Sequence, residues 1–173
     1  MNLEQVKKSI DNNYNKRNNK TINLSCTLKQ LNNDEKTIAI KYISEKYPDL
    51  EVLILMCNKI TYLGDSLNNF NKLRFLNLSN NKIVELGDSF NNLKNLRKLY
   101  LNDNKIEKID GSFNNLKNLQ ELHLSYNKIK TINDNFNILI NLEILGIFKN
   151  QIPLVQIYNY VNTSEKLIVC YYD

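Results

Sequence analysis

A 23-residue repeat is the feature that most constrains what this chain can fold into. Residues 73–95 read LRFLNLSNNKIVELGDSFNNLKN, and residues 96–118 read LRKLYLNDNKIEKIDGSFNNLKN. Self-similarity at this period is typical of a solenoid, in which each unit stacks on its neighbours because it cannot bury its apolar face alone. The blocks begin at Leu50, Leu73, Leu96, Leu119 and Leu142.

The opening of each block predicts a short strand. Its pattern is Leu-x-x-Leu-x-Leu-x-x-Asn-x-Ile, and in the third block Leu99 and Leu101 alternate around Tyr100. Since side chains in a strand point alternately to its two faces, the two leucines face one side and Tyr100 faces the other. We therefore expect stacked strands to form a parallel sheet on the inner side of an arc, with the rest of each block returning over the outer side.

This pattern resembles the leucine-rich repeat family over residues 50–152. The rest of each block, LGDSFNNLKN and its variants, is similar to the 23-residue subclass of intracellular proteins. That subclass more often carries Ile where this chain has Leu67, Phe90, Phe113 and Phe136. The resemblance implies an α/β leucine-rich repeat solenoid, a short curved arc with a parallel β-sheet on its concave side and helical caps at both ends. It also implies a non-enzymatic module that binds a partner protein on the concave face, with a scaffolding or regulatory role.

Two further columns of the repeat are predicted to be structural. The aromatic column of Phe90, Phe113 and Phe136 is expected to stack into a spine beneath the outer side, where burial of each ring contributes a few kcal/mol. A second column is made of asparagines, whose side chains carry both donors and an acceptor and can satisfy buried turns of the backbone. It contains Asn58, Asn81, Asn104, Asn127 and Asn150.

Residues 1–49 break the repeat and are expected to form an N-terminal cap, because a solenoid exposes an apolar face at each end. A first amphipathic helix precedes a strand in TINLS, residues 21–25, which resembles that of a degenerate repeat. A second helix, DEKTIAIKYISEKYP, is expected to begin with Asp34 as its N-cap and to end at Pro48. The side chains expected to point inward are Leu3, Val6, Ile10, Ile22, Leu24, Ala39, Ile40, Ile43 and Tyr47.

Residues 153–173 also break the repeat and are expected to form a C-terminal cap. Pro153 suits the first turn of a helix, and the segment KLIVCYY, residues 166–172, is expected to be a final strand slightly out of phase with the repeat. That strand closes the sheet or leaves an edge for a second copy. We expect a monomer, with a strand-edge dimer as the alternative. The helix is expected to turn inward Leu154, Ile157, Tyr158 and Val161.

The variable positions of the strands predict the binding surface. At one end of the arc they are apolar, and exposed apolar clusters tend to mark contact sites; the alternative is that the N-terminal cap folds over them. Further along they are aromatic, which is typical of binding hot spots, although ordinary surface variation would give the same pattern. The residues predicted to contact a partner are Val52, Ile54, Met56, Phe75, Asn77, Lys98, Tyr100, Glu121, His123, Tyr126 and Phe148.

A column of lysines offers an alternative function. Lys59, Lys82, Lys105 and Lys128 follow the asparagine column, and the chain carries a net charge of +5. The simpler interpretation is a solvated rim, and the alternative is a basic strip that binds nucleic acid or another acidic partner. A nucleic-acid partner is disfavoured because arginine is scarce and no RNA-binding motif is present.

The remaining residues predict neither an enzyme nor a membrane protein. The single histidine, His123, has only Tyr100, Glu121 and Ser125 as expected neighbours, and no phosphate-binding loop, metal-ligand set or cofactor motif is present. We therefore expect no catalytic residues, cofactor or metal. No stretch reaches the roughly 18 apolar residues of a membrane span, and the N-terminus lacks the apolar core of a signal peptide. Three widely spaced cysteines favour a reducing, cytoplasmic location.

Overall fold

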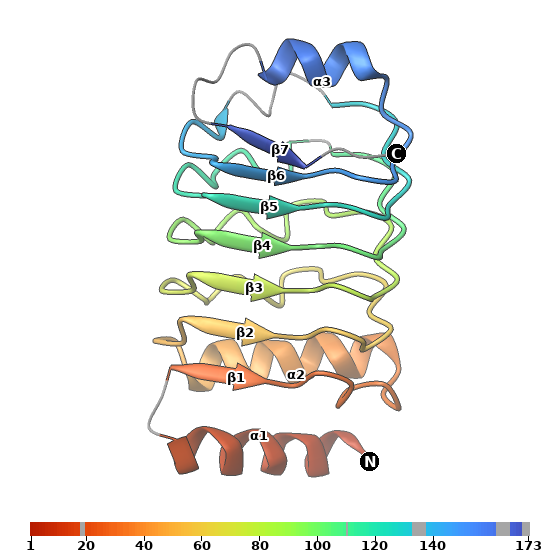
Figure 1. Cartoon of the computed structure of the whole chain (residues 1–173). Coiled ribbons are helices and arrows are strands. Elements are labelled where there is room, and N and C mark those ends of the chain that lie inside the picture. The colour runs from red at the N-terminus through yellow and green to blue at the C-terminus, as the bar shows by residue number, and fades with distance from the viewer. Residues whose placement is uncertain (18–19, 110, 133–137, 162–166, 171–173) are drawn as a thin grey trace.

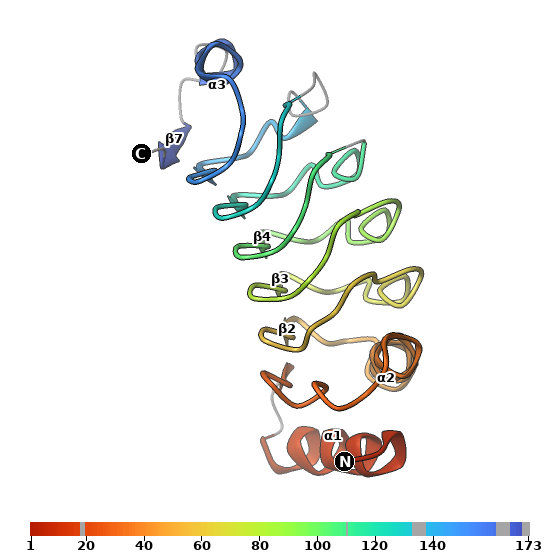
Figure 2. The same cartoon turned by 90° about the vertical axis from the view of Figure 1, so that its right-hand side faces the viewer.

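The computed structural model is an arc built on a seven-stranded parallel sheet, with strand order β1-β2-β3-β4-β5-β6-β7 (Figure 1). It describes the chain except for residues 18–19, 110, 133–137, 162–166 and 171–173. Figure 2 shows the strands on the inner side of the arc and the return segments on the outer side, as the repeat predicted. The strands are β1 (Thr21–Asn23), β2 (Val52–Ile54), β3 (Phe75–Asn77), β4 (Lys98–Tyr100), β5 (Glu121–His123), β6 (Ile144–Gly146) and β7 (Ile168–Cys170).

The register of the sheet confirms the phase of the repeat. Each strand has three residues, and its central side chain is a fully buried aliphatic residue from β2 to β6. The flanking side chains from β2 to β5 and that of Ile144 in β6 look into the hollow of the arc. Strand pairing advances by the 23-residue step from β2 to β6, whereas Ile144 pairs with Ile168 after 24 residues. The aligned central residues are Leu53, Leu76, Leu99, Leu122 and Leu145.

The asparagine column is a hydrogen-bonded ladder, as predicted. Asn104 is typical: its Oδ1 accepts from Ile83 N at 3.0 Å, and its Nδ2 donates to Leu78 O at 3.0 Å and Leu101 O at 3.1 Å. Each side chain therefore satisfies its own turn and the turn of the preceding repeat. Because these backbone groups are buried, a missing partner would cost free energy.

The residue directly before each ladder asparagine has a left-handed backbone. Its φ is between 52° and 59° in every repeat, and the equivalent residue of the N-terminal cap, Cys26, has a φ of 61°, although none of these residues is glycine. Such a conformation is uncommon for residues with a Cβ, and it repeats here because the same sharp bend ends every strand. The residues are Cys26, Cys57, Asn80, Asp103, Tyr126 and Lys149.

The outer side of the core contains the predicted aromatic spine. Phe90 and Phe113 are buried, and their rings stack with centroids 6.1 Å apart. Phe136, the third expected member, lies outside the described residues. Phe70 is also fully buried and extends the aromatic core at a column where later repeats have leucine.

The N-terminal cap consists of α1 (Leu3–Arg17), β1 and α2 (Asn33–Lys46), and α2 takes the place of the extended return of a repeat (Figure 2). The predicted inward side chains of both helices and β1 are buried, except Leu3, which is half-buried. Asp34 is not the N-cap of α2, contrary to expectation. Asn32 caps the helix because its side chain accepts from Glu35 N while the Glu35 carboxylate accepts from Asn32 N, which forms a capping box.

A single carboxylate ties α1 to α2. Asp11 accepts hydrogen bonds from Tyr42 at 2.9 Å, Tyr47 at 2.7 Å and Lys46 at 2.7 Å. Burial alone would raise the pKa of Asp11, but the hydrogen bonds from Lys46, Tyr47 and Tyr42 outweigh it and lower the pKa. Burial and the Asp11 hydrogen bond raise the pKa of Tyr47 to about 12. The network therefore needs an ionised Asp11 and a protonated Tyr47.

The C-terminal cap consists of α3 (Leu154–Val161) and β7, with α3 at the opposite end of the stack from α1 (Figure 1). Ile157 is buried, as predicted, but Leu154 and Tyr158 are 51% and 65% exposed. The predicted inward face of this helix was therefore wrong at Leu154 and Tyr158, while the side chain of Val161, the fourth expected residue, lies outside the described residues. Within the described residues, no helix has the length and apolarity needed to cross a bilayer.

Candidate functional site

The predicted contact residues lie together on the concave face and its rim, and none is buried in the core. They come from the strands β2 to β5 and from positions two or three residues after the strands β2, β5 and β6. One neighbouring position behaves differently: Ser79 occupies the same repeat position as Met56 and Phe148, but it is only 7% exposed.

The centre of the concave face carries a row of three rings, Phe75, Tyr100 and His123, from the consecutive strands β3, β4 and β5. We call it the concave aromatic row. Phe75 and Tyr100 meet edge to face with centroids 5.1 Å apart, and Tyr100 and His123 meet at 4.5 Å. All three side chains remain partly exposed. Since the strands hold neighbouring rings at fixed spacing, the row is a pre-organised surface.

A polar network holds the row on one side. The Glu121 carboxylate pairs with Lys98 Nζ at 2.7 Å and accepts a hydrogen bond from the Tyr100 hydroxyl at 3.0 Å. Burial opposes ionisation of Glu121, but the hydrogen bonds from Lys98 and Tyr100 lower its pKa overall. Burial and the bond to Glu121 raise the pKa of Tyr100. At neutral pH Tyr100 is therefore a fixed donor to an ionised Glu121.

His123 is the least satisfied group of the concave face. Its Nε2 is buried without a hydrogen-bond partner among the described residues and lies 3.9 Å from Glu121 Oε2. Burial lowers the pKa of His123, and the opposing attraction of Glu121 does not restore it. The imidazole is thus neutral at pH 7. Gly146 makes room for it, because a Cβ at this position would stand 3.1 Å from His123 Nδ1.

The apolar end of the concave face is not sealed by the N-terminal cap. Val52, Ile54 and Met56 remain partly exposed beside Phe75, although β1 pairs with β2 and places Thr21 next to Val52. The alternative in which the cap folds over this patch is therefore wrong. The patch and the concave aromatic row form one continuous apolar and aromatic surface across β2, β3, β4 and β5.

A second aromatic pair stands on the rim at the other end of the arc. Tyr126 is 51% exposed and meets Phe148 edge to face with centroids 5.2 Å apart. Lys149 Nζ lies 5.0 Å from the centre of the Phe148 ring, within the range of a cation–π contact. The left-handed backbone at Tyr126 turns this ring away from the core.

The lysine column lies along the turn beside the asparagine ladder. Lys59, Lys82, Lys105 and Lys128 are exposed, and within the described part of the chain no carboxylate pairs with them. Their spacing follows the repeat, so they form a regular row of positive charge at the rim.

Family models match this architecture. The model described as "Leucine rich repeat" matches residues 48–106, and that described as "Leucine Rich repeats (2 copies)" matches residues 94–137. The chain belongs to the leucine-rich repeat family. No curated protein matches it.

Two solved leucine-rich repeat structures are similar to the chain. One, a complex of TLR13 with ssRNA13, is 34% identical over 70% of this chain with a TM-score of 0.63. The other is an internalin, InlF, from Listeria monocytogenes, which is 23% identical over 78% of this chain with a TM-score of 0.66. The chain spans 18% of the length of the first and 39% of the second. The internalin likeness shows the fold alone.

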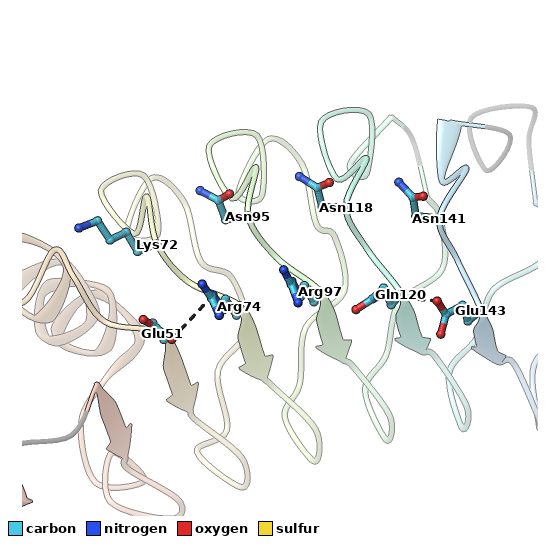
Figure 3. Close-up of a pocket in the computed structure, with 9 residues that line it drawn as sticks. All are labelled: Glu51, Lys72, Arg74, Asn95, Arg97, Asn118, Gln120, Asn141 and Glu143. Carbon is cyan, nitrogen blue, oxygen red and sulfur yellow. Dashed lines mark hydrogen bonds and ion pairs between the residues drawn. The ribbon is translucent and has the colours of Figure 1, made fainter.

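The structure also contains a groove that the repeat pattern did not predict. This edge groove has a volume of about 460 Å³ and follows the edge of the sheet where the chain enters each strand (Figure 3). Its base is formed by the residue that directly precedes each strand. Its wall is formed on the return segments by a different repeat position from that of the ladder, occupied by Lys72, Asn95, Asn118 and Asn141. The lining residues are Glu51, Lys72, Arg74, Asn95, Arg97, Asn118, Gln120, Asn141 and Glu143.

The groove is polar and unevenly charged. Arg74 lies 3.7 Å from Glu51, and Gln120 donates to Glu143 at 3.5 Å, whereas Arg97 forms no ion pair within the described part of the leucine-rich repeat. Arg97 thus presents a guanidinium that can bind a carboxylate. The sequence feature that could have predicted this exposed guanidinium is the recurrence of arginine at the same repeat position, as Arg74 and Arg97.

Proposed function

We propose that the chain binds a partner protein on its concave face and acts as a scaffolding or regulatory module. The observation that carries this proposal is the concave aromatic row of Phe75, Tyr100 and His123, whose rings touch one another yet remain partly exposed. Aromatic residues dominate the binding energy of protein interfaces. The core is complete without these rings, because the opposite face of each strand is filled by buried leucines.

The arrangement of polar groups favours a partner with both apolar and hydrogen-bonding side chains. The patch of Val52, Ile54 and Met56 offers apolar area beside the row, and Glu121 and Lys98 neutralise each other beside Tyr100. A partner that covers them does not bury an uncompensated charge, which would be costly.

Affinity capture with matched tyrosine variants tests the proposal. The full chain is immobilised and exposed to lysate of its source cells, and captured proteins are quantified for wild type, Tyr100→Ala and Tyr158→Ala. Tyr158 is an exposed tyrosine on α3, away from the sheet, so its variant controls for the loss of a surface ring. We expect a partner whose capture falls about tenfold or more with Tyr100→Ala and is unchanged with Tyr158→Ala.

The proposal fails if every protein that the wild-type chain captures is retained equally by Tyr100→Ala and Phe75→Ala. Thermal unfolding of each variant is measured in parallel. If Tyr100→Ala and Phe75→Ala unfold the chain, these rings belong to the core and the assignment of the concave face is wrong.

A second candidate function is nucleic-acid binding through the lysine column. The net charge of +5 and the exposed row of Lys59, Lys82, Lys105 and Lys128 favour it, as does the 34% identity to TLR13, which has been solved in complex with ssRNA13. Binding to single-stranded RNA would weaken steeply with added salt because counterions are released. Absence of binding at low salt removes this candidate, and nuclease treatment of the lysate separates it from direct protein capture.

A further inference from the structure

Two cysteines occupy equivalent positions on neighbouring strands of the sheet. The register of β1 on β2 pairs Thr21 with Val52 and Asn23 with Ile54, an offset that brings Cys26 opposite Cys57. The parallel ladder continues beyond the strands as far as this point, since Cys26 N donates to Met56 O at 2.9 Å and Cys57 N donates to Ser79 O at 3.1 Å. The two residues are therefore true neighbours across the ladder.

Their backbones also have the same conformation. Cys26 has a φ of 61° and Cys57 a φ of 59°, so the two side chains leave the same bend in parallel directions. Neighbouring strands lie about 4.8 Å apart, which falls inside the range of roughly 4.4–6.8 Å that disulfides span between Cα atoms. Cys26 is exposed and Cys57 is partly exposed, so a small reagent reaches both.

We propose that Cys26 and Cys57 form a dithiol site that a peroxide oxidises to an intramolecular disulfide. One cysteine, as its thiolate, attacks a peroxide oxygen, the O–O bond breaks, and the released hydroxide leaves as water, which gives a sulfenic acid. The sulfur of the other cysteine then attacks the sulfenic sulfur, and the departing hydroxide takes the thiol proton as a second water. Two thiols lose two electrons together, and one peroxide is reduced to two waters.

The environment of Cys57 is consistent with contact between the thiols. Burial raises the pKa of Cys57, and the neighbouring Cys26 thiol raises it further. A protonated thiol is a poor nucleophile, so the raised pKa disfavours Cys57 as the attacking thiolate. Cys26 is also the more exposed of the two side chains.

Closure of this pair would fasten the N-terminal cap to the first full repeat. The bond would enclose α2, because this helix lies between the two cysteines in the chain, and it would join β1 to β2 at the rim next to Met56. A cross-link that closes a loop of this length restricts the unfolded chain. The oxidised form should therefore melt about 5–15 °C above the reduced form.

The test uses the full chain with Cys170→Ser, so that Cys26 and Cys57 are its remaining thiols. The protein is treated with a small excess of hydrogen peroxide, blocked with N-ethylmaleimide, and analysed by intact mass and peptide mapping. We expect a monomer lighter by two hydrogens, a peptide that links Cys26 to Cys57, and reversal by a reducing agent. Its melting temperature should rise on oxidation and fall again on reduction.

Single-cysteine controls distinguish two thiols that are positioned to form a disulfide from two thiols that react independently. Cys26→Ser or Cys57→Ser, each combined with Cys170→Ser, removes the resolving thiol, so the remaining cysteine should accumulate as a sulfenic acid that dimedone traps. The proposal is overturned if the chain that keeps both cysteines gives equal dimedone trapping at each and no linked peptide, or if its disulfides form only between molecules. Circular dichroism before treatment confirms that each variant is folded.

Discussion

Replacement of Asn104 by alanine gives the sharpest test of how the repeats are held together. The Ile83 N–H would lose its acceptor while remaining buried, which costs about 1–3 kcal/mol. Leu78 O and Leu101 O would each lose one of their two side-chain amide donors, at about 0.5–1.5 kcal/mol each. The free energy of unfolding should therefore fall by about 2–6 kcal/mol.

Urea denaturation followed by far-UV circular dichroism measures this change. Asn92→Ala serves as the matched control, because Asn92 is an exposed asparagine on the return segment of the preceding repeat, and it should change the stability by less than about 0.5 kcal/mol. Asn104→Asp should destabilise at least as much as Asn104→Ala at neutral pH, since a carboxylate oxygen would replace the amide donor and face backbone carbonyls. Equal stability of Asn104→Ala and Asn92→Ala would refute a structural role for the ladder.

Three further predictions concern the core, the histidine and the cap. Phe113→Ala should reduce the free energy of unfolding by about 3–5 kcal/mol, while Lys105→Ala should be near neutral; equal effects in urea denaturation would contradict the assignment of faces. Because burial lowers the pKa of His123, the unfolded chain binds its proton more readily, so stability should fall as the pH drops below about 6.5. Thermal melts of His123→Gln should show a smaller loss between about pH 7.5 and pH 5, and an identical loss would count against a neutral buried histidine. Asp11→Asn should cost about 1–3 kcal/mol at pH 7, and since the pKa of Asp11 is lowered, the difference should shrink as the pH falls through about 4; a cost that does not change with pH would exclude the ionised carboxylate.

The columns of the repeat could be predicted because each is enforced by a single physical demand. Leu99 and Leu101 must share one face of a strand, and a buried bend needs a side chain with both donors and an acceptor, such as Asn104. These demands recur in every block, so the sequence repeats the same residue at the same step. The concave positions follow from the same phase, which is why Tyr100 and His123 could be placed before their contacts were known.

The features that could not be predicted depend on packing without a repeated sequence. The left-handed bend is occupied by residues as different as Cys57 and Tyr126, since the bend constrains the backbone and not the side chain. The predicted orientation of α3 was wrong at Leu154 and Tyr158. A single short helix on the last repeat has no neighbouring copy in the sequence that would show which of its faces is buried. The edge groove was not predicted because its polar residues have the sequence pattern of ordinary solvent-exposed surface. Only the curved fold brings them together.

The asparagine ladder gives the stack a direction. Every ladder asparagine serves the bend of the repeat before it, as Asn81 does for Asn58 N and Ile60 N and Asn127 does for Ile106 N. Deletion of a repeat from the N-terminal side would leave each surviving bend with its own support, whereas deletion from the C-terminal side would orphan the bend that becomes terminal. Unfolding should therefore begin at the β7 end. Truncated chains that keep the later repeats should be more stable than truncated chains that keep the earlier ones.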